Sequence, residues 1–140
     1  MELLLVLALV GVLSVIATPT LVSYVKTSAL EAGARELATV INLGRQVAIS
    51  QNTAVCVELV GSNVRLRQGG CAGTVWTGPG TDGAGVIKLS DPSTLVSSTA
   101  NVVFSNLGAA SPAGTYTVAR AGDDRTRSVV VAATGRVSVR

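Results

Sequence analysis

The chain contains no histidine. This absence removes imidazole general bases, the Ser-His and Cys-His nucleophile pairs, and every zinc site that needs a histidine ligand. The two cysteines are too few for a zinc site built from cysteine alone. Asp123 and Asp124 are adjacent carboxylates, but their glycine and arginine neighbours are typical of a solvated turn. We therefore expect no catalytic residue, no metal and no cofactor, and an enzyme is the least favoured class of function.

Aromatic side chains are scarce, with one tryptophan, two tyrosines and one phenylalanine in 140 residues. The core of any folded domain must therefore consist mainly of Val, Leu, Ile and Ala. The length is typical of one domain plus an anchor. Beyond the first 52 residues about 88 remain, which is enough for a small core only.

Charged side chains are absent from residues 3–25. At about 1.5 Å per residue this run makes a helix of roughly 35 Å, and the hydrocarbon core of a bilayer is about 30 Å thick. A cleavable signal peptide would instead have a cationic start and a small-residue cleavage site, whereas this run is preceded by Met1 and Glu2, which bring no cationic side chain. The run therefore predicts a transmembrane helix, with Pro19 inside it.

The helical pattern continues past the uncharged run. Between Thr27 and Gln51, apolar or small residues recur at three- and four-residue spacing, which is typical of an amphipathic helix. We expect one continuous helix ending at Asn52, with a transmembrane half at residues 1–25 and an amphipathic half at residues 26–52. The positions expected to pack on a head are Leu30, Ala34, Leu37, Ile41, Gly44 and Ala48.

From Thr53 onward, short β-branched runs alternate with Gly, Ser, Asn, Asp and Pro, which is typical of antiparallel strands. Residues 53–140 are therefore predicted to form a small antiparallel β-sheet head, and the fold class is α+β. Strands are expected at residues 53–60, 64–68, 86–90, 101–105, 115–120, 127–133 and 136–139, hairpin turns at 61–63, 122–124 and 134–135, and long loops at 69–85 and 91–100.

Cys56 and Cys71 both lie beyond the uncharged run. They form either a disulfide or two buried thiols. An oxidising compartment favours the disulfide, and closing a loop of about 15 residues would stabilise a small head by about 3 kcal/mol. We favour the disulfide, because a small core with few large side chains gains from a cross-link.

The formal net charge is +3, and residues 1–52 hold as many acidic as basic side chains, so the excess lies in the head. Five arginines follow residue 119, against two aspartates in the same region. Either ordinary surface charge or a basic face accounts for them. Arg136 and Arg140 would share one face of a strand, because side chains alternate along it.

The segment Glu2-Leu-Leu-Leu-Val-Leu-Ala-Leu-Val-Gly-Val-Leu, followed by Pro19 and the amphipathic extension, resembles the N-terminal region of type IV pilins and pseudopilins. In that family a leader ending in glycine is removed, and a glutamate stands fifth in the mature chain. Glu2 matches this glutamate, and Pro19 matches the proline seventeen residues later. The family pattern places the leader and the first three mature residues, with leader cleavage and N-methylation, upstream of Met1.

Several parts of the head are similar to the GspH/FimT subgroup of the same family. These are the strand that begins at Cys56, the 71–82 loop with Trp76, the 101–105 strand, and Gly135-Arg136-Val137. The resemblance implies the pilin fold, in which a long N-terminal helix packs on a β-rich head.

The resemblance also implies a structural subunit. It would cross the bacterial inner membrane once, with the head in the periplasm, and then be assembled into a type IV pilus or a type II secretion pseudopilus. Its partners would be other pilin or pseudopilin subunits and the inner-membrane assembly platform. Glu2 would compensate the N-terminal ammonium of a neighbouring subunit, since a buried carboxylate needs a cation nearby. Pro19 would let the helix loosen during extraction and packing.

Some members of the subgroup belong to DNA-uptake pili and carry a C-terminal Gly-Arg-x-Arg motif. Here Gly135-Arg136-Val137-Ser138 has the first arginine and lacks the second. The alternative function is therefore a minor pilin that binds double-stranded DNA at the tip of a competence pilus. A third interpretation, a single-span protein that never assembles, gives Glu2 no role. The candidate phosphate contacts are Arg136, Arg140, Arg125 and Arg127.

Overall fold

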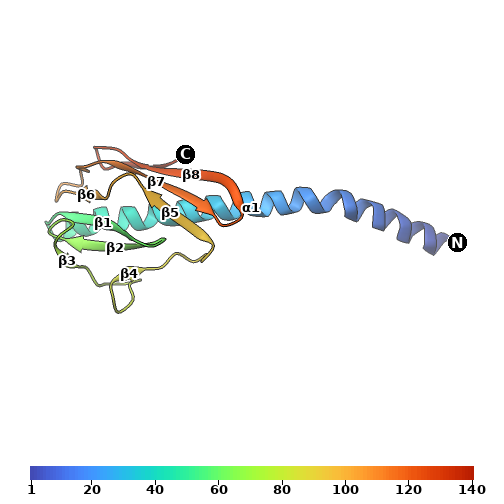
Figure 1. The fold of residues 1–140 in the computed structure, drawn as a ribbon, viewed down its shortest axis with the longest axis horizontal. Coiled ribbons are helices and arrows are strands. Elements are labelled where there is room, and N and C mark those ends of the chain that lie inside the picture. The colour runs from blue at the N-terminus through green and yellow to red at the C-terminus, as the bar shows by residue number, and fades with distance from the viewer.

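One helix dominates the computed structural model, which describes all 140 residues (Figure 1). Helix α1 spans Glu2–Ser50 and passes through Pro19 without a break. Figure 1 shows its N-terminal portion curving away from the axis of the rest, and an internal proline removes one backbone hydrogen bond and bends a helix. The expected end at Asn52 is two residues too late. Asn52 has a φ of +50°, a left-handed conformation that cannot continue the helix.

The head consists of two antiparallel sheets, and the α+β class is confirmed. The first sheet has the strand order β3-β2-β1-β6, with β4 also paired to β2, and the second has the order β5-β7-β8-β9. The strands are β1 Val55–Val60, β2 Asn63–Gln68, β3 Thr74–Val75, β4 Val86–Ile87, β5 Thr94–Ser98, β6 Val102–Phe104, β7 Gly114–Arg120, β8 Asp123–Val131 and β9 Val137–Val139.

The long loop expected at residues 91–100 is wrong, because β5 lies inside it and pairs with β7. Thr94 and Val96 face the core, whereas Leu95 is about half exposed. The inward face of this strand thus carries a polar residue and the outward face an apolar one, which hides the alternation. The strand expected at residues 86–90 shortens to Val86–Ile87, and the 69–85 loop contains the two-residue β3.

The core lies between α1 and the two sheets. Figure 1 shows α1 running along the length of the head, where it contacts strands of both sheets. All six positions expected to pack on the head are buried, at the three- and four-residue spacing of one helix face. Glu36 adds a polar link, because the backbone N–H and the hydroxyl of Ser90 both donate to its carboxylate, at 3.0 and 2.8 Å. The buried residues of α1 are Leu30, Gly33, Ala34, Leu37, Val40, Ile41, Gly44, Val47 and Ala48.

Three segments meet at the end of the head farthest from Met1. Arg45 of α1 donates from Nε to the carbonyl of Gly108, in the loop after β6, at 3.0 Å. Gly135, in the turn between β8 and β9, has a φ of +84°, and a Cβ there would lie 1.8 Å from the same carbonyl oxygen. Only glycine permits this close approach, which joins the helix to both sheets.

We expect Gly135→Ala to lower the free energy of unfolding by about 2–4 kcal/mol, through the left-handed backbone and the clash together. Gly122→Ala is the matched control, because Gly122 has a φ of +78° but no atom within 4 Å of its would-be Cβ. It should cost about 1 kcal/mol. Urea unfolding of the full chain in detergent micelles, followed by Trp76 fluorescence, measures both. Equal losses would show that the contact with Gly108 is unimportant.

Candidate functional site

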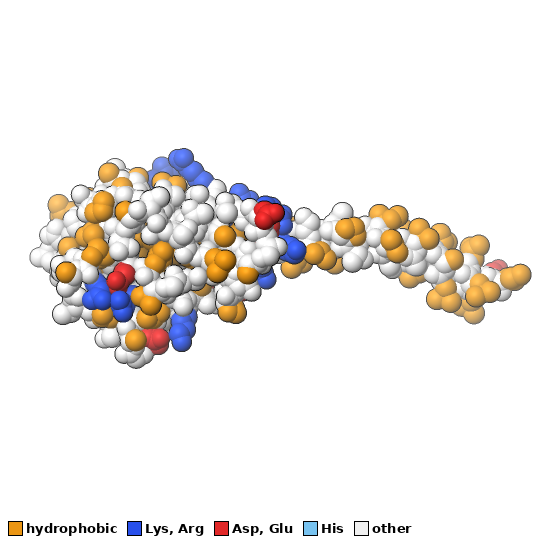
Figure 2. All heavy atoms as spheres, in the orientation of Figure 1, with side chains coloured by type: hydrophobic (Ala, Val, Ile, Leu, Met, Phe, Trp, Pro, Cys, Tyr) orange, Lys and Arg blue, Asp and Glu red, His pale blue; other side chains and the backbone are white.

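The first half of α1 has no contact with the head. No residue before Thr27 is even partly buried. An 18-residue window of this half reaches a mean hydropathy of 2.4 with none of it buried, so the helix is long and apolar enough to cross a membrane. Figure 2 shows hydrophobic side chains covering this stalk. An apolar surface of this size requires a bilayer or other helices around it.

Glu2 and Pro19 both lie on this exposed half. Glu2 is in the first turn of α1, where the helix dipole favours a negative charge, and it forms no ion pair within the chain. It lies at the far end of the stalk from the head (Figure 1). The structure therefore leaves the Glu2 carboxylate available to a group from outside the chain.

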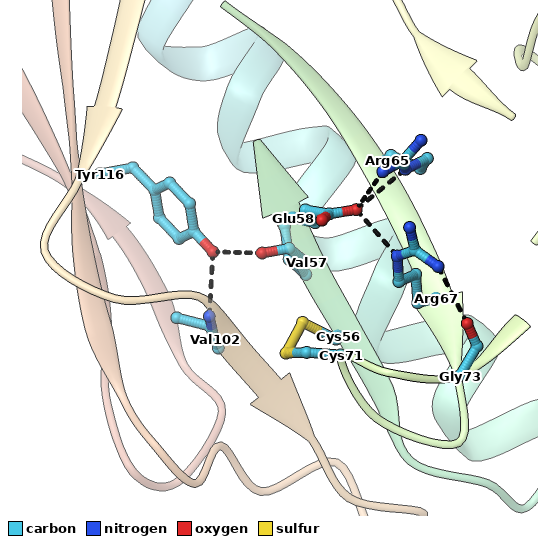
Figure 3. The surroundings of a disulfide bond; sticks show 9 residues. All are labelled: Cys56, Val57, Glu58, Arg65, Arg67, Cys71, Gly73, Val102 and Tyr116. Carbon is cyan, nitrogen blue, oxygen red and sulfur yellow. Dashed lines mark hydrogen bonds and ion pairs between the residues drawn. A yellow bond between two sulfur atoms is a disulfide. The ribbon is translucent and has the colours of Figure 1, made fainter. Parts of the chain in front are cut away.

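Cys56 and Cys71 form a disulfide, as expected from the sequence. Cys56 is fully buried on β1, and Cys71 lies in the loop between β2 and β3. The bond therefore attaches this loop to the first sheet (Figure 3). Neither sulfur is free for nucleophilic or metal chemistry.

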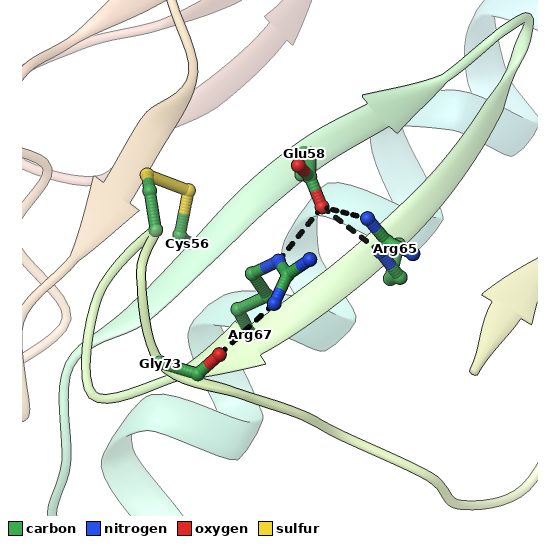
Figure 4. Close-up of polar contacts among 6 residues, drawn as sticks. Cys56, Glu58, Arg65, Arg67 and Gly73 are labelled. Atoms are coloured by element: carbon green, nitrogen blue, oxygen red, sulfur yellow. Dashed lines mark hydrogen bonds and ion pairs between the residues drawn. A yellow bond between two sulfur atoms is a disulfide. The ribbon is translucent and has the colours of Figure 1, made fainter. Parts of the chain in front are cut away.

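A carboxylate and two arginines lie beside the disulfide. Arg65 and Arg67 each donate from Nε to one oxygen of Glu58, at 2.9 Å (Figure 4). Arg67 also donates from Nη1 to the carbonyl of Gly73, at 3.0 Å, which fixes the disulfide loop a second time. Partial burial raises the pKa of Glu58, but the two guanidinium groups lower it by more, so that pKa lies below its usual value. We call the ion-paired side chains of Glu58, Arg65 and Arg67 the acid–base triad, a name that refers to their opposite charges.

Tyr116 joins the two sheets. Its hydroxyl, carried by β7 of the second sheet, donates to the carbonyl of Val57 at 3.0 Å and accepts from the N–H of Val102 at 3.1 Å. Both partners belong to the first sheet (Figure 3). The side chain is fully buried, and burial raises the pKa of the Tyr116 phenol to about 12. Its two hydrogen bonds satisfy the hydroxyl inside the core.

The four candidate phosphate-binding arginines do not lie together. Arg136 and Arg140 share one face, as alternation predicts, and line a shallow groove of about 340 Å³ with Val130, Ala132 and Ser138. Arg127 lies with Arg140 in a second groove, which also borders Glu31 and Arg35 of α1. Arg125 is bound by the Asp123 carboxylate and by the Thr27 hydroxyl. Two of the four, Arg136 and Arg140, therefore form the outer basic face.

The expectation of two solvated carboxylates is wrong for Asp123. Its side chain is 8% exposed and forms an ion pair with Arg125. Hydrogen bonds from the Arg125 side chain and backbone lower the pKa of Asp123 and keep it charged. Asp124 is exposed, so the two carboxylates do not face a common site.

The sequence model of the family described as Type II transport protein GspH matches residues 33–135. The chain belongs to this family. The matched residues cover most of the amphipathic half of α1 and nearly all of the head, and they leave out the exposed stalk with Glu2 and Pro19. No curated protein sequence matches the chain.

Solved structures with the same fold include a type IV minor pilin and a minor pseudopilin. The type IV minor pilin FimU of Pseudomonas aeruginosa is 16% identical with a TM-score of 0.60, covering 84% of this chain and 92% of that chain. The minor pseudopilin EpsH from the Type 2 Secretion System of Vibrio cholerae is 9% identical with a TM-score of 0.60, covering 79% and 95%. At these identities the likeness establishes the fold, and the pilin fold expected from the sequence is confirmed.

Sequence reasoning missed the acid–base triad of this GspH-family head, although a signal was present. The observed β1–β2 turn is Gly61-Ser62, which sets Glu58 opposite Arg65, with Arg67 two residues further on the same face. Counting outward from the three-residue turn expected at 61–63 sets Glu58 opposite Leu66 instead, so the pairs could be found only with the two-residue turn. The link from Tyr116 to Val57 joins residues far apart in sequence, and no local pattern signals it.

We expect Glu58→Gln to lower the free energy of unfolding by about 1 kcal/mol at pH 7, because two charge-assisted hydrogen bonds are weakened. The pKa of Glu58 is lowered by folding, so its stabilising effect is fully present above the unfolded-state pKa and fades as pH falls through the folded-state pKa. The loss should therefore shrink between pH 5 and about pH 3.

Glu31→Gln is the control, because Glu31 forms only an exposed pair with Arg35 on one helix. It should cost less than about 0.5 kcal/mol. Urea unfolding of the full chain in micelles at several pH values gives both numbers. A loss for Glu58→Gln that stays constant with pH would contradict the assignment.

Proposed function

We propose that the chain is a structural minor pilin or pseudopilin subunit, held in the bacterial inner membrane by its N-terminal helix and then assembled into a type IV pilus or a type II secretion pseudopilus. Membership of the GspH family and the shared fold of FimU and EpsH support the structural role. The observation that carries the proposal is the bare apolar half of α1, which has no packing partner within its own chain. Its partners are the bilayer first and the helices of other subunits afterwards.

The exposure of α1 supports three functional segments. Residues 1–25 are the transmembrane and assembly half, residues 26–52 are the amphipathic half that carries the head, and residues 53–140 are the periplasmic head. The first partly buried side chain is that of Thr27, close to the proposed boundary. Tyr24 and Lys26 stand at the same level, and aromatic and cationic side chains are common at the membrane–water interface.

Glu2 is the residue that distinguishes assembly from simple anchoring. A carboxylate that enters a bundle of packed helices needs a cation, and the N-terminal ammonium of a neighbouring subunit supplies one. Attraction between these two groups sets the axial register of each added subunit. Pro19 provides a weak point in α1 at which the helix can adjust as it leaves the bilayer.

We expect Glu2→Ala to leave membrane insertion unchanged and to lower incorporation into filaments about tenfold or more, since removal of one partner leaves a buried charge uncompensated. Crosslinking in cells, followed by isolation of surface filaments and membranes, measures both quantities. Ser14→Ala is the control, because the Ser14 hydroxyl bonds only to its own helix, at Val10. Normal incorporation of the Glu2 variant would leave only an anchoring role.

The second candidate function is DNA binding by a minor pilin at the tip of a competence pilus. It is supported by the outer basic face, where Arg136 and Arg140 line one groove. No carboxylate forms an ion pair with either side chain. Both guanidinium groups are therefore free to contact successive phosphates of double-stranded DNA.

We expect the full chain in detergent micelles to retard duplex DNA in a salt-dependent way, with log Kd rising by about two units per tenfold rise in salt for two phosphate contacts. Arg136→Gln should reduce this slope by about one. Arg120→Gln serves as the control, because Arg120 is already paired with Asp91 at 2.8 Å. No retardation at low salt would exclude the DNA-binding function.

A further inference from the structure

Charged side chains of both signs gather in the corner where α1 leaves the head. Figure 2 shows charged side chains concentrated at this junction, between the apolar stalk and the head. Lys26 follows the last residue of the uncharged run. Arg125, close to the turn between β7 and β8, donates to the hydroxyl of Thr27, so the base of the head contacts α1 at the same level. Charged side chains therefore lie around the point at which α1 enters the head.

A groove lies on this corner. Glu31 and Arg35 of α1 form one wall, and Arg127, Val139 and Arg140 of β8 and the C-terminal segment form the other, around a volume of about 340 Å³. A neighbouring hollow of about 320 Å³ extends it along α1, over Ser28 and Ala32. We call the groove between α1 and Arg127 the junction groove.

The charges around the junction groove do not cancel. Glu31 is paired with Arg35, and Asp123 is paired with Arg125. Arg127 and Arg140 have no carboxylate in ion-pair distance. Asp124 is exposed near the start of β8 but does not line the groove. The groove is therefore bordered by two arginines without a carboxylate partner, Arg127 on its wall and Arg140 at its rim, where Arg140 also borders the outer groove. Such a border suits an anion with several acceptor oxygens.

The groove begins just above the level of the lipid headgroups. A bilayer adds roughly 5–8 Å of headgroup region to each side of its hydrocarbon core. At about 1.5 Å per residue, Glu31 lies roughly 8 Å beyond Lys26 along the helix axis, and Arg35 roughly 14 Å. Flexible arginine side chains cover the remaining distance, since they extend toward charged groups while their methylenes stay on the protein.

We propose that the junction groove binds the phosphate of an anionic phospholipid headgroup in the leaflet that faces the head, with Arg127 and Arg140 as the ligands. The inference rests on the membrane anchor of the proposed function. The contact holds the head at a fixed height and tilt on the bilayer before extraction. Duplex DNA fits this corner poorly, because it would have to enter between the head and the membrane surface.

The test uses the full chain reconstituted in phosphatidylcholine vesicles with a trace of spin-labelled phosphatidylglycerol or spin-labelled phosphatidylcholine. Electron spin resonance measures the fraction of each labelled lipid that the protein immobilises. We expect a preference for phosphatidylglycerol that falls by about twofold to fivefold in Arg127→Gln, as expected for the loss of one cation near the membrane surface. Arg127 makes no side-chain hydrogen bond or ion pair, so the head of this variant should fold normally.

Lys88→Gln is the matched control, because it removes one exposed positive charge from the head but lies outside the junction groove. Its preference for phosphatidylglycerol should equal that of the unmodified chain. If the preference for phosphatidylglycerol fell equally in both variants, net charge alone would explain it, and the proposal would be overturned. Displacement of the labelled lipid by added duplex DNA that persists in Arg136→Gln, which lacks the outer basic face, would assign the groove to nucleic acid and would also overturn the proposal.

An alkaline wash separates this inference from the function on which it rests. A chain that washes off vesicles of either composition has no membrane anchor, and the proposed function and the lipid site fail together. A chain that stays inserted but immobilises both labelled lipids equally retains the proposed function and refutes the lipid site alone.

Discussion

The packing of one face of α1 along both sheets is the interaction on which the rest of the molecule depends. The two sheets are separate hydrogen-bonded units, and the buried residues of α1 between Leu30 and Ala48 fill the space that both of them border. The helix therefore acts as the shared core element of a head with few aromatic residues. The hydroxyl of Tyr116 adds a direct polar link between the sheets, and Arg45 closes the far end through Gly108.

The same helix has opposite requirements on the two sides of Thr27. Beyond it one face must match the sheets, and before it every face is apolar and bare. The matched region of the GspH family begins at residue 33, within the part that packs on the head. The head is thus a folded unit built around half of a helix, and the other half is available for a bilayer or a filament. Charges at the junction, including Lys26 and Arg125, mark the change of surroundings.

Features set by local periodicity could be predicted from the sequence, and those set by contacts between distant segments could not. The spacing of apolar residues correctly identified the buried face of α1, and Gly61 and Gly122 located two hairpin turns, although Asn63, Asp123 and Asp124 belong to the strands that follow. Strand β5 was missed because Leu95 faces outward. Alternation correctly placed Arg136 and Arg140 on one face. It could not place Arg125, because the pairing of β7 with β8 shifts register beside Arg120 and the Arg125 side chain donates to α1. The acid–base triad required the exact register of β1 and β2.

The lengthwise position of α1 has a mechanical consequence. Any machine that draws this subunit out of a membrane or resists its withdrawal pulls along the helix axis. Because the buried face extends over residues 30–48, a length of roughly 27 Å, such a load acts on the helix–sheet interface in shear. All of its side chains then resist sliding at once, whereas a helix attached crosswise would peel away one turn at a time.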